Sequence, residues 1–452
     1  MSAYKDLTEQ KLSLEKELLG PYRLVVGLEI HMHVKTDHGM FCACSTEGVY
    51  DAPSNTHTCP VCLGLPGALP VPNEDAIKQT HRLGIAFHCE LNKESRFDRK
   101  HYFYPDLPKG YQISQYLKPL CGEGYLDLPT GSRVELERIH LEEDTAKSFH
   151  EGGKTLIDFN KSGMPLIEMV TKPSIHSAWE AAEFGRQVRE IVRYLGVSDA
   201  DMEKGQMRVE PNISLQTAEM AKNGKLPDYK VEIKNINSFK FMEKAILYEI
   251  KRQREILESG EVPLQENRGY DEASGETVPQ RSKEEAHDYR YFPEPDIPPM
   301  SFDGAYFEDL KKTVKRLPEE TKKELIEEKG LSRQEADVLV SEDLVDLLYG
   351  VVDLGVVFDE AVNLLVNRPE YREFSAEEFA AKIKEQSNKI EDMAALETVV
   401  GEVLAENPQV VAEIESGKDS AKEYLLGQVM RKTKGKADPV IVRRLLTTRF
   451  QG

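Results

Sequence analysis

The sequence predicts an α+β protein in which an antiparallel sheet comes first and helices follow. Residues 21–300 contain all 6 cysteines and all 11 histidines and carry short runs of alternating apolar and polar residues, which are typical of half-buried strands. Beyond them the chain becomes rich in Glu, Lys, Leu and Ala. There, Ser332 with Glu335 and Ser375 with Glu378 fit capping boxes that open helices.

These changes in composition predict three domains. We place a sheet domain at residues 1–300, a helical domain at 301–390 and a small helical tail domain at 391–452. The Pro-rich residues 292–299 are typical of a linker between the first two domains.

Composition limits the class of protein. The chain has 452 residues, of which 40% are hydrophobic and 31% charged, a balance typical of globular domains rather than of disordered, collagen or coiled-coil chains. Its best apolar stretch, residues 347–358, is shorter than the roughly 18 residues of a membrane span. Residues 1–20 lack the apolar core of a signal peptide, so we predict a cytoplasmic protein without membrane contact.

Charge is unevenly distributed along the chain. The formal net charge of −20 argues against a surface coated in basic residues for nucleic acid. Residues 421–452 are nevertheless basic. Their cations are Lys422, Arg431, Lys432, Lys434, Lys436, Arg443, Arg444 and Arg449. A solvated helix face and a surface that contacts phosphates both explain such a run, and the sequence alone leaves the two open.

The clearest strand covers residues 23–35. Its even positions are all apolar, whereas Glu29, His31 and His33 occupy odd positions. Because side chains alternate across a strand, these polar residues share the face away from the core, with Glu29 and His31 about 6–7 Å apart. A carboxylate and an imidazole at this spacing can bind one ligand, although antiparallel strands commonly have one face in water.

Three further segments, residues 138–143, 207–215 and 229–235, carry polar side chains on one face in the same way. The polar residues on them are His140, Glu142, Arg208, Glu210, Asn212, Lys230, Glu232 and Lys234, with Glu143 and Asp144 at the end of the first. Carboxylates cluster at an energetic cost unless cations lie between them. The strands therefore predict a polar cavity that holds Mg²⁺ with bound phosphates, and a plain solvent face is the alternative.

Cysteine spacing predicts a separate metal site. Cys42 and Cys44 form a C-x-C pair, and Cys59 and Cys62 form a C-x-x-C pair. Four thiolates from two such turns match a closed tetrahedral Zn²⁺ site, which is structural because no coordination position is open. A redox pair is the weaker alternative. The nearby histidines that can replace a thiolate are His38 and His57.

Two loops, residues 99–115 and 288–296, mix basic and aromatic residues, which suits nucleotides or RNA ends, although each loop can equally pack its rings onto the domain. The cations expected to neutralise phosphate charge are Arg99, Lys100, Lys109, Arg208 and Lys234. The sequence has no complete P-loop, G-x-G-x-x-G or G-x-S-x-G motif. If ATP is bound, metal ions and side chains hold its phosphates.

Several sequence strings together resemble one family. They are residues 27–31 (GLEIH), 59–67 (CPVCLGLPG), 99–115, 140–144 (HLEED), 232–238 (EIKNINS), 288–296 (DYRYFPEPD), 427–430 (GQVM) and 433–437 (TKGKA). From about residue 21 to its last residues, the chain resembles the B subunit of aspartyl/glutamyl-tRNA amidotransferase.

This resemblance implies a glutamine-synthetase-like antiparallel catalytic domain, a helical domain and a helical tail that contacts tRNA. It implies a ligase that uses ATP to phosphorylate the side-chain carboxylate of Glu-tRNA(Gln) or Asp-tRNA(Asn). Ammonia from an amidase (A) subunit then displaces the phosphate to give the amide. The implied assembly is a heterotrimer of the A subunit, this chain and a small C subunit.

The resemblance also implies roles for particular residues. The catalytic residues would be Glu29, His31, Glu142, Glu143, Glu210 and Glu232; the magnesium ligands would be Glu29, His31, Glu143 and Glu232, with Glu142 in place of or beside Glu143; and the zinc ligands would be the four cysteines. The sequence departs from the family pattern at Glu210, where Asp is usual, at Ala146, where Gly is common, and at Gly39, where Lys is frequent. We expect the longer Glu210 to shift the metal or to bind it through water.

Two other functions fit parts of the sequence. A ligase acting on free glutamate or a small peptide needs the same carboxylate-lined site but no RNA surface. A zinc-stabilised RNA-binding scaffold needs the cysteines and the basic residues but no catalysis. The sequence also lacks glutaminase motifs. This absence agrees with the amidotransferase hypothesis, in which the chain receives ammonia from elsewhere through a path shielded from water.

Overall fold

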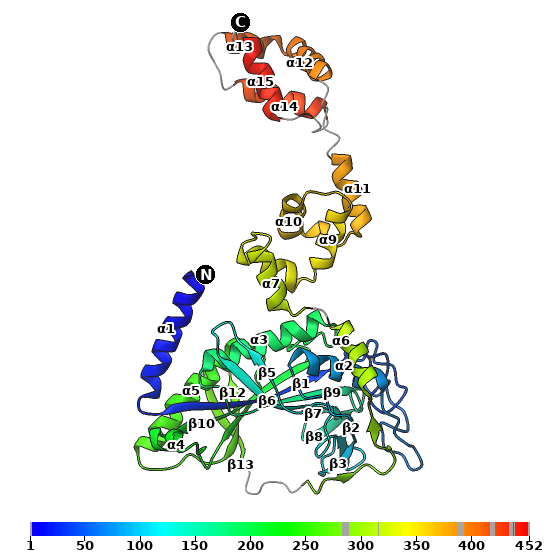
Figure 1. The fold of residues 1–452 in the computed structure, drawn as a ribbon, viewed down its shortest axis with the longest axis vertical. Coiled ribbons are helices and arrows are strands. Elements are labelled where there is room, and N and C mark those ends of the chain that lie inside the picture. The colour runs from blue at the N-terminus through cyan, green and yellow to red at the C-terminus, as the bar shows by residue number, and fades with distance from the viewer. Residues whose placement is uncertain are drawn as a thin grey trace. The chain divides into compact units, whose positions relative to one another are not determined.

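The computed structural model describes residues 2–282, 289–314, 316–386, 393–415, 421–433, 437 and 439–450. They form two compact units, residues 1–324 and 325–452, which Figure 1 shows. Every described strand lies in the first unit, and the second is helical. The predicted order of a sheet region followed by helices is therefore confirmed.

An eight-stranded sheet forms the centre of the first unit. Its strand order is β13-β12-β11-β10-β1-β9-β6-β5, and neighbouring strands are antiparallel except β11 and β12, which are parallel. The strands are β1 (Arg23–His33), β5 (Gly124–Asp127), β6 (Arg133–Glu143), β9 (Pro165–Thr171), β10 (Met207–Gln216), β11 (Val231–Lys234), β12 (Glu266–Asp271) and β13 (Glu276–Ser282). All four segments predicted as strands lie within five consecutive strands of this sheet.

The apolar side chains of the sheet pack into one large core. Leu28, Ile30 and Met32 of β1 are each at most 1% exposed. They share this core with the helices α2 (Glu74–Ala86), α3 (Ala178–Tyr194) and α5 (Phe239–Glu258), and Figure 1 shows α3 alongside the sheet. Helix α1 (Ser2–Leu19) packs against α3 and α5. Since even positions of β1 enter the core, its odd positions face the other way, as predicted.

Short strands form three smaller sheets. They are β2 (Glu94–Ser95), β3 (Asp98–His101), β4 (Tyr111–Ser114), β7 (Lys147–Glu151), β8 (Lys154–Asp158), β14 (Phe292–Pro293) and β15 (Met300–Ser301). Strand β14 pairs with β3, and β15 pairs with β2. The prediction that residues 292–299 form a linker is therefore wrong, because strands of the first unit pair with the start of this stretch and with the two residues directly after it. The side chain of Glu294, between them, is buried against Arg99.

The chain after the sheet domain is helical. Its helices are α6 (Gly304–Thr313), α7 (Pro318–Glu327), α8 (Arg333–Ser341), α9 (Val345–Asp353), α10 (Phe358–Asn367), α11 (Ala376–Gln386), α12 (Met393–Glu406), α13 (Pro408–Glu415), α14 (Ala421–Lys432) and α15 (Pro439–Phe450). Helix α6 packs against α2, so the first unit extends beyond residue 300. Helices α12 to α15 share a core of their own. The expected division at residue 390 lies outside the described residues.

Both predicted capping boxes are present. Ser332 and Glu335 exchange side-chain to backbone hydrogen bonds at the start of α8, and Ser375 and Glu378 do the same before α11.

Among the described residues, none of the helices is both long enough and apolar enough to cross a membrane.

Candidate active site and metal centres

The polar face of the large sheet brings acidic side chains from several strands together. Strand register sets Glu29 of β1 opposite Glu210 of β10 and sets His31 opposite Glu168 of β9. Glu232 of β11 follows one strand further along. Like charges directly opposite each other destabilise a sheet, so this arrangement calls for a cation.

Glu29, Glu210 and Glu232 form the first acid group, in which one carboxylate oxygen from each lies within 4.8 Å of the others. The Nζ atom of Lys234 lies 3.0 Å from oxygens of both Glu210 and Glu232, and Asn212 Nδ2 donates to Glu29 Oε1 at 3.0 Å. Burial raises the pKa of Glu29, and the charges of nearby acids add to this effect. The Oδ1 atom of Asn212 is buried without a hydrogen-bond partner in the described part of the chain, which fits a site completed by a bound cation.

His31, Glu142 and Glu168 form the second acid group, again with ligand atoms within 4.8 Å of one another. His31 Nε2 lies 3.5 Å from Glu168 and 3.8 Å from Glu142. Burial by itself lowers the pKa of His31, but the charges of Glu168 and Glu142 outweigh it and raise the pKa to about 9. A metal ion in this group would replace the proton and leave a neutral imidazole ligand.

Both groups fit a hard divalent cation. Mg²⁺ binds oxygen ligands at about 2.0–2.1 Å in an octahedron, which sets neighbouring ligand atoms about 3 Å apart and opposite ones about 4 Å apart. The ligand atoms within each group lie closer than 4.8 Å, so each can hold one ion with little movement. Each group would leave several positions for water or phosphate oxygens.

Glu143 is not brought to either acid group. It follows Glu142 on β6 and therefore points away from it. Its carboxylate accepts from Lys109 Nζ at 2.6 Å and from the backbone N–H of Ile113 at 2.9 Å. Of the two carboxylates considered as metal ligands in this motif, the structure places Glu142 in the second acid group and ties Glu143 to Lys109.

The five cations predicted to neutralise phosphate charge have different surroundings. Arg99 forms a two-pronged ion pair with Glu294, at 2.6 and 2.8 Å, and Lys109 is held by Glu143. Lys234 lies in the first acid group. Lys100 lies over the ring of Tyr289 at 5.0 Å. Arg208 is held by Asp144.

A chain of hydrogen bonds connects the polar face to the cysteine loop. Arg208 Nη2 donates to Asp144 Oδ1 at 3.0 Å, and Asp144 Oδ2 lies 2.7 Å from His33 Nε2. The Nδ1 atom of His33 lies 2.6 Å from the hydroxyl of Tyr50. In the sequence, Tyr50 lies between the two cysteine pairs. Although burial alone raises the pKa of Asp144, Arg208 and His33 hold it well below its usual range. Asp144 therefore fixes Arg208 beside the acid groups.

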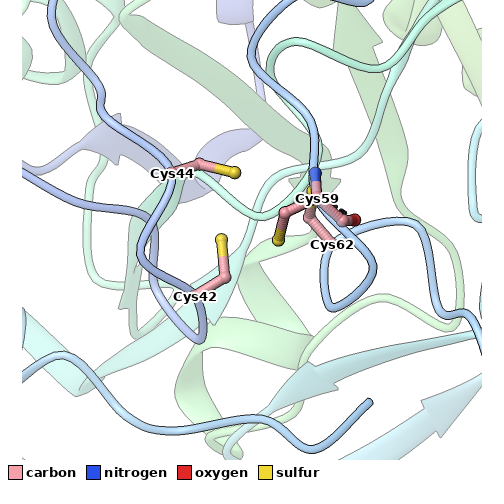
Figure 2. A group of neighbouring side chains, drawn as sticks. All are labelled: Cys42, Cys44, Cys59 and Cys62. Carbon is pink, nitrogen blue, oxygen red and sulfur yellow. Dashed lines mark hydrogen bonds between the residues drawn. The ribbon is translucent and has the colours of Figure 1, made fainter. Parts of the chain in front are cut away.

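The four predicted cysteines converge. Figure 2 shows Cys42 and Cys44 on one loop facing Cys59 and Cys62 on another, and their Sγ atoms lie within 4.8 Å of one another. The backbone N–H of Cys59 donates to Cys62 Sγ at 3.1 Å. The neighbouring Cys42 thiol, together with this backbone bond, outweighs the effect of burial and lowers the pKa of Cys62 to about 5. Four thiols in this arrangement fit tetrahedral Zn²⁺, and neither His38 nor His57 belongs to the group.

Glu168 is the main site residue that the sequence did not predict. It lies in the otherwise apolar segment of β9 and is 8% exposed. An acidic residue inside an apolar strand is a usable signal, because a buried carboxylate needs a cation or donors beside it. His140 provides one partner, with its Nε2 atom 3.3 Å from Glu168.

The fold and these sites define a class of protein: one with an acidic sheet face that could hold cations, a four-thiol centre and appended helical domains. Residues 24–308 match the family model described as the GatB/GatE catalytic domain, and residues 357–450 match the GatB domain. A Thermotoga maritima protein, named as the B subunit of aspartyl/glutamyl-tRNA(Asn/Gln) amidotransferase, is 40% identical over 95% of this chain and 99% of that protein. Proteins of the same name from a Roseiflexus species and from Thermodesulfovibrio yellowstonii are 41% and 39% identical, over 94% of this chain and 97% and 98% of those proteins.

The chain therefore belongs to the family of B subunits of aspartyl/glutamyl-tRNA(Asn/Gln) amidotransferases. The resemblance found in the sequence is confirmed, and so are the activity class of a tRNA-amidating ligase and the membership of a multi-subunit enzyme.

Proposed function

We propose that this chain activates the side-chain carboxylate of Glu-tRNA(Gln) or Asp-tRNA(Asn) with ATP and then directs its amidation in the cytoplasm. An oxygen of the carboxylate attacks the γ-phosphorus, the bond from that phosphorus to the β-phosphate oxygen breaks, and ADP leaves. Ammonia then attacks the acyl carbon, loses a proton and expels inorganic phosphate. The proposed partners are an amidase (A) subunit that supplies ammonia, a small C subunit and the misacylated tRNA.

One observation carries this proposal: two acid groups share one polar face. Phosphoryl transfer depends mainly on positioning and on stabilising charge, and carboxylates accept a nucleoside triphosphate only with cations between them. We propose that Glu29, Glu210 and Glu232 hold one Mg²⁺ and that His31, Glu142 and Glu168 hold another. Bound metal would supply charge stabilisation for the transferred phosphoryl group.

We propose that side chains of the protein complete the phosphate site. Arg208, fixed by Asp144, and Lys234, between two glutamates, supply positive charge near the phosphates. The thiol centre lies in a different part of the unit and, with four Sγ ligands, has no open position for substrate. We propose that it holds Zn²⁺ to fix its two loops.

An ATP hydrolysis assay tests this function. The chain is purified with its amidase and C subunits, and ADP and amide formation are measured with Glu-tRNA(Gln), with Asp-tRNA(Asn), with deacylated tRNA and without RNA. We expect ADP only with a misacylated tRNA and a strong loss of it in Glu29→Gln. The exposed Glu135→Gln on β6 is the matched control.

The other two functions predict different outcomes. ATP turnover with free glutamate and no RNA would favour a small-molecule ligase. RNA binding without any dependence on Mg·ATP would favour a scaffold. Full activity of Glu29→Gln would reject the assignment of the first acid group.

A further inference from the structure

A small cavity opens beside both acid groups. Glu29 of the first group and Glu168 of the second line it, together with Lys100, Arg138, His140 and Tyr291. Its volume is about 140 Å³, well below the roughly 300–1,000 Å³ of pockets that hold an entire drug-sized ligand. The cavity therefore suits one small group that reaches in from a larger substrate.

A β-bulge turns Arg138 and His140 toward this cavity. In β6 the core residues are Val134 and Leu136 before the bulge but Ile139 and Leu141 after it. The register with β9 shifts between Leu136 and Arg138. One extra residue exchanges the two faces of a strand, so Arg138 and His140 join the polar face.

The cavity contains polar atoms that lack partners. The Nε atom of Arg138 is buried, and the described residues offer it no hydrogen-bond partner; its Nη1 atom contacts Glu137 at 2.5 Å. The same holds for Nδ1 of His140, whose side chain is only 4% exposed. Lys100 forms no ion pair within the described part of the chain. The unpartnered Nε–H of Arg138 is a costly buried donor, and together with the ammonium group of Lys100 it favours an anionic ligand.

We propose that this cavity holds the side-chain carboxylate of the amino acid carried by the tRNA, with Arg138 and Lys100 as its binding residues. The inference rests on the proposed function and names the subsite for its acceptor. The carboxylate has to lie beside the γ-phosphate, and the cavity adjoins both acid groups. A triphosphate brings its own metal ions to the acid groups, whereas the acceptor carboxylate brings none. The acceptor carboxylate can therefore approach a face rich in glutamates only if cationic side chains of the protein offset the repulsion.

The rings around the cavity support this assignment. Tyr291 stacks on Tyr116 with ring centroids 4.3 Å apart and planes 9° apart, and both line the cavity. An acyl phosphate hydrolyses readily, so aromatic rings on this side of the cavity would help by leaving less room for water.

A comparison of acid and amide isolates this interaction. The complex with its amidase and C subunits is titrated with Glu-tRNA(Gln) and Gln-tRNA(Gln), which share the same RNA and differ only in the side-chain carboxylate. The pair Asp-tRNA(Asn) and Asn-tRNA(Asn) is measured likewise. We expect the wild type to prefer the acid, and Arg138→Met to weaken acid binding about 10-fold or more while amide binding is unchanged.

Further variants guard against a folding defect. Arg138→Lys should retain part of the preference, and Lys100→Met should reduce it in the same acid-specific way. Arg133 is an exposed arginine of β6 that pairs with Asp127. Its substitution Arg133→Met should leave the acid preference unchanged.

The possible failures are distinguishable. Equal weakening of acid and amide binding, or a wild-type acid preference that survives in Arg138→Met, would overturn the subsite while RNA-dependent ADP formation by the wild type stands. A wild-type complex that forms no ADP with misacylated tRNA would reject the proposed function and the subsite together.

Discussion

Individual side chains on the polar face are placed where they repel each other unless something else is bound. Glu168 shows how side chains of the protein offset part of this repulsion, because it is buried between His31 and His140. Both histidines hold the pKa of Glu168 well below its usual range even though burial alone would raise it. The carboxylate is therefore ionised at neutral pH, the state in which it could serve as a metal ligand.

Replacing Glu168 tests the second acid group. We expect Glu168→Gln to lower kcat for RNA-dependent ADP formation by at least about 100-fold and to raise the Mg²⁺ concentration needed for half-maximal rate, because even residues that only support metal ligands matter by about 10–100-fold. Steady-state kinetics over a Mg²⁺ series measure both effects. Glu135→Gln serves as the control, and an unchanged Mg²⁺ requirement in Glu168→Gln would remove this residue from the ligand set.

At the scale of elements, the two cysteine loops depend on one another. Neither loop contains regular helix or strand around its cysteines. His57 Nδ1 lies 2.9 Å from the carbonyl oxygen of Ser45, and a metal ion held by the four thiols would add a stronger connection between the loops. We expect about one Zn²⁺ per chain in the purified protein and its loss in Cys59→Ser, with Tm lowered by several degrees. Metal analysis and thermal unfolding measure these changes.

Cys89→Ser is the matched control, because Cys89 lies outside the four-thiol group. It should leave the zinc content unchanged. A protein that is metal-free as purified, and whose Tm a chelator does not alter, would contradict a structural zinc site.

Helix α1 is joined to α3 by a buried carboxyl group. Glu15 is 3% exposed and accepts from the backbone N–H of Ala178 at 2.8 Å and from Ser177 Oγ at 3.0 Å. Burial outweighs these hydrogen bonds and raises the pKa of Glu15 from 4.5 to about 7. The folded state therefore prefers the protonated acid.

This shift predicts a pH-dependent effect of Glu15→Gln. A carboxyl group with a raised folded-state pKa contributes its stability fully below about pH 4.5 and loses it as pH rises through about 7. The glutamine has no proton to lose, so its free energy of unfolding relative to wild type should rise by up to about 3 kcal/mol between pH 4.5 and pH 8. Denaturant unfolding at several pH values measures this difference. The exposed Glu17→Gln should show no such trend, and a flat difference for Glu15→Gln would contradict the raised pKa.

At the scale of the whole molecule, the net charge of −20 conceals opposite local charges. Acidic residues gather on the polar face, whereas α14 and α15 carry exposed arginines. Two of the basic residues there are already paired, Lys432 with Glu402 and Glu406, and Arg443 with Glu423. Arg431, Arg444 and Arg449 are exposed, and Lys434 and Lys436 lie outside the described residues.

The contrast between paired and exposed basic residues allows a specific test of tRNA contact by the tail. If α14 and α15 bind phosphates, Arg431→Gln with Arg444→Gln should weaken tRNA binding and reduce its salt dependence by about one in slope for each phosphate that is no longer bound. Binding isotherms at several salt concentrations measure the slope. Arg443 neighbours Arg444 but is paired with Glu423, so Arg443→Gln should reduce the salt dependence less. Unchanged slopes in the double variant would identify the basic run as a solvated helix face.

Much of this protein was determined by sequence patterns that act locally. The alternation in β1 set which residues face the core, the spacing of the four cysteines predicted their cluster, and the capping residues predicted the starts of α8 and α11. The alternation and the capping residues are informative because neighbouring residues along one element have a constant geometry, whereas the cysteine pattern is informative because a tetrahedral metal site needs four ligands.

Only the tertiary structure decided which elements become neighbours. The pairing of β1 with β9 added Glu168 to the second acid group, while the bulge in β6 placed Glu142, rather than Glu143, on the polar face and turned Arg138 toward the cavity. Residues 292–299, which looked like a linker, became part of the sheet domain because strands β2 and β3, about 200 residues earlier in the chain, offered free edges. Such contacts depend on the pairing of distant segments, and no local periodicity encodes that pairing.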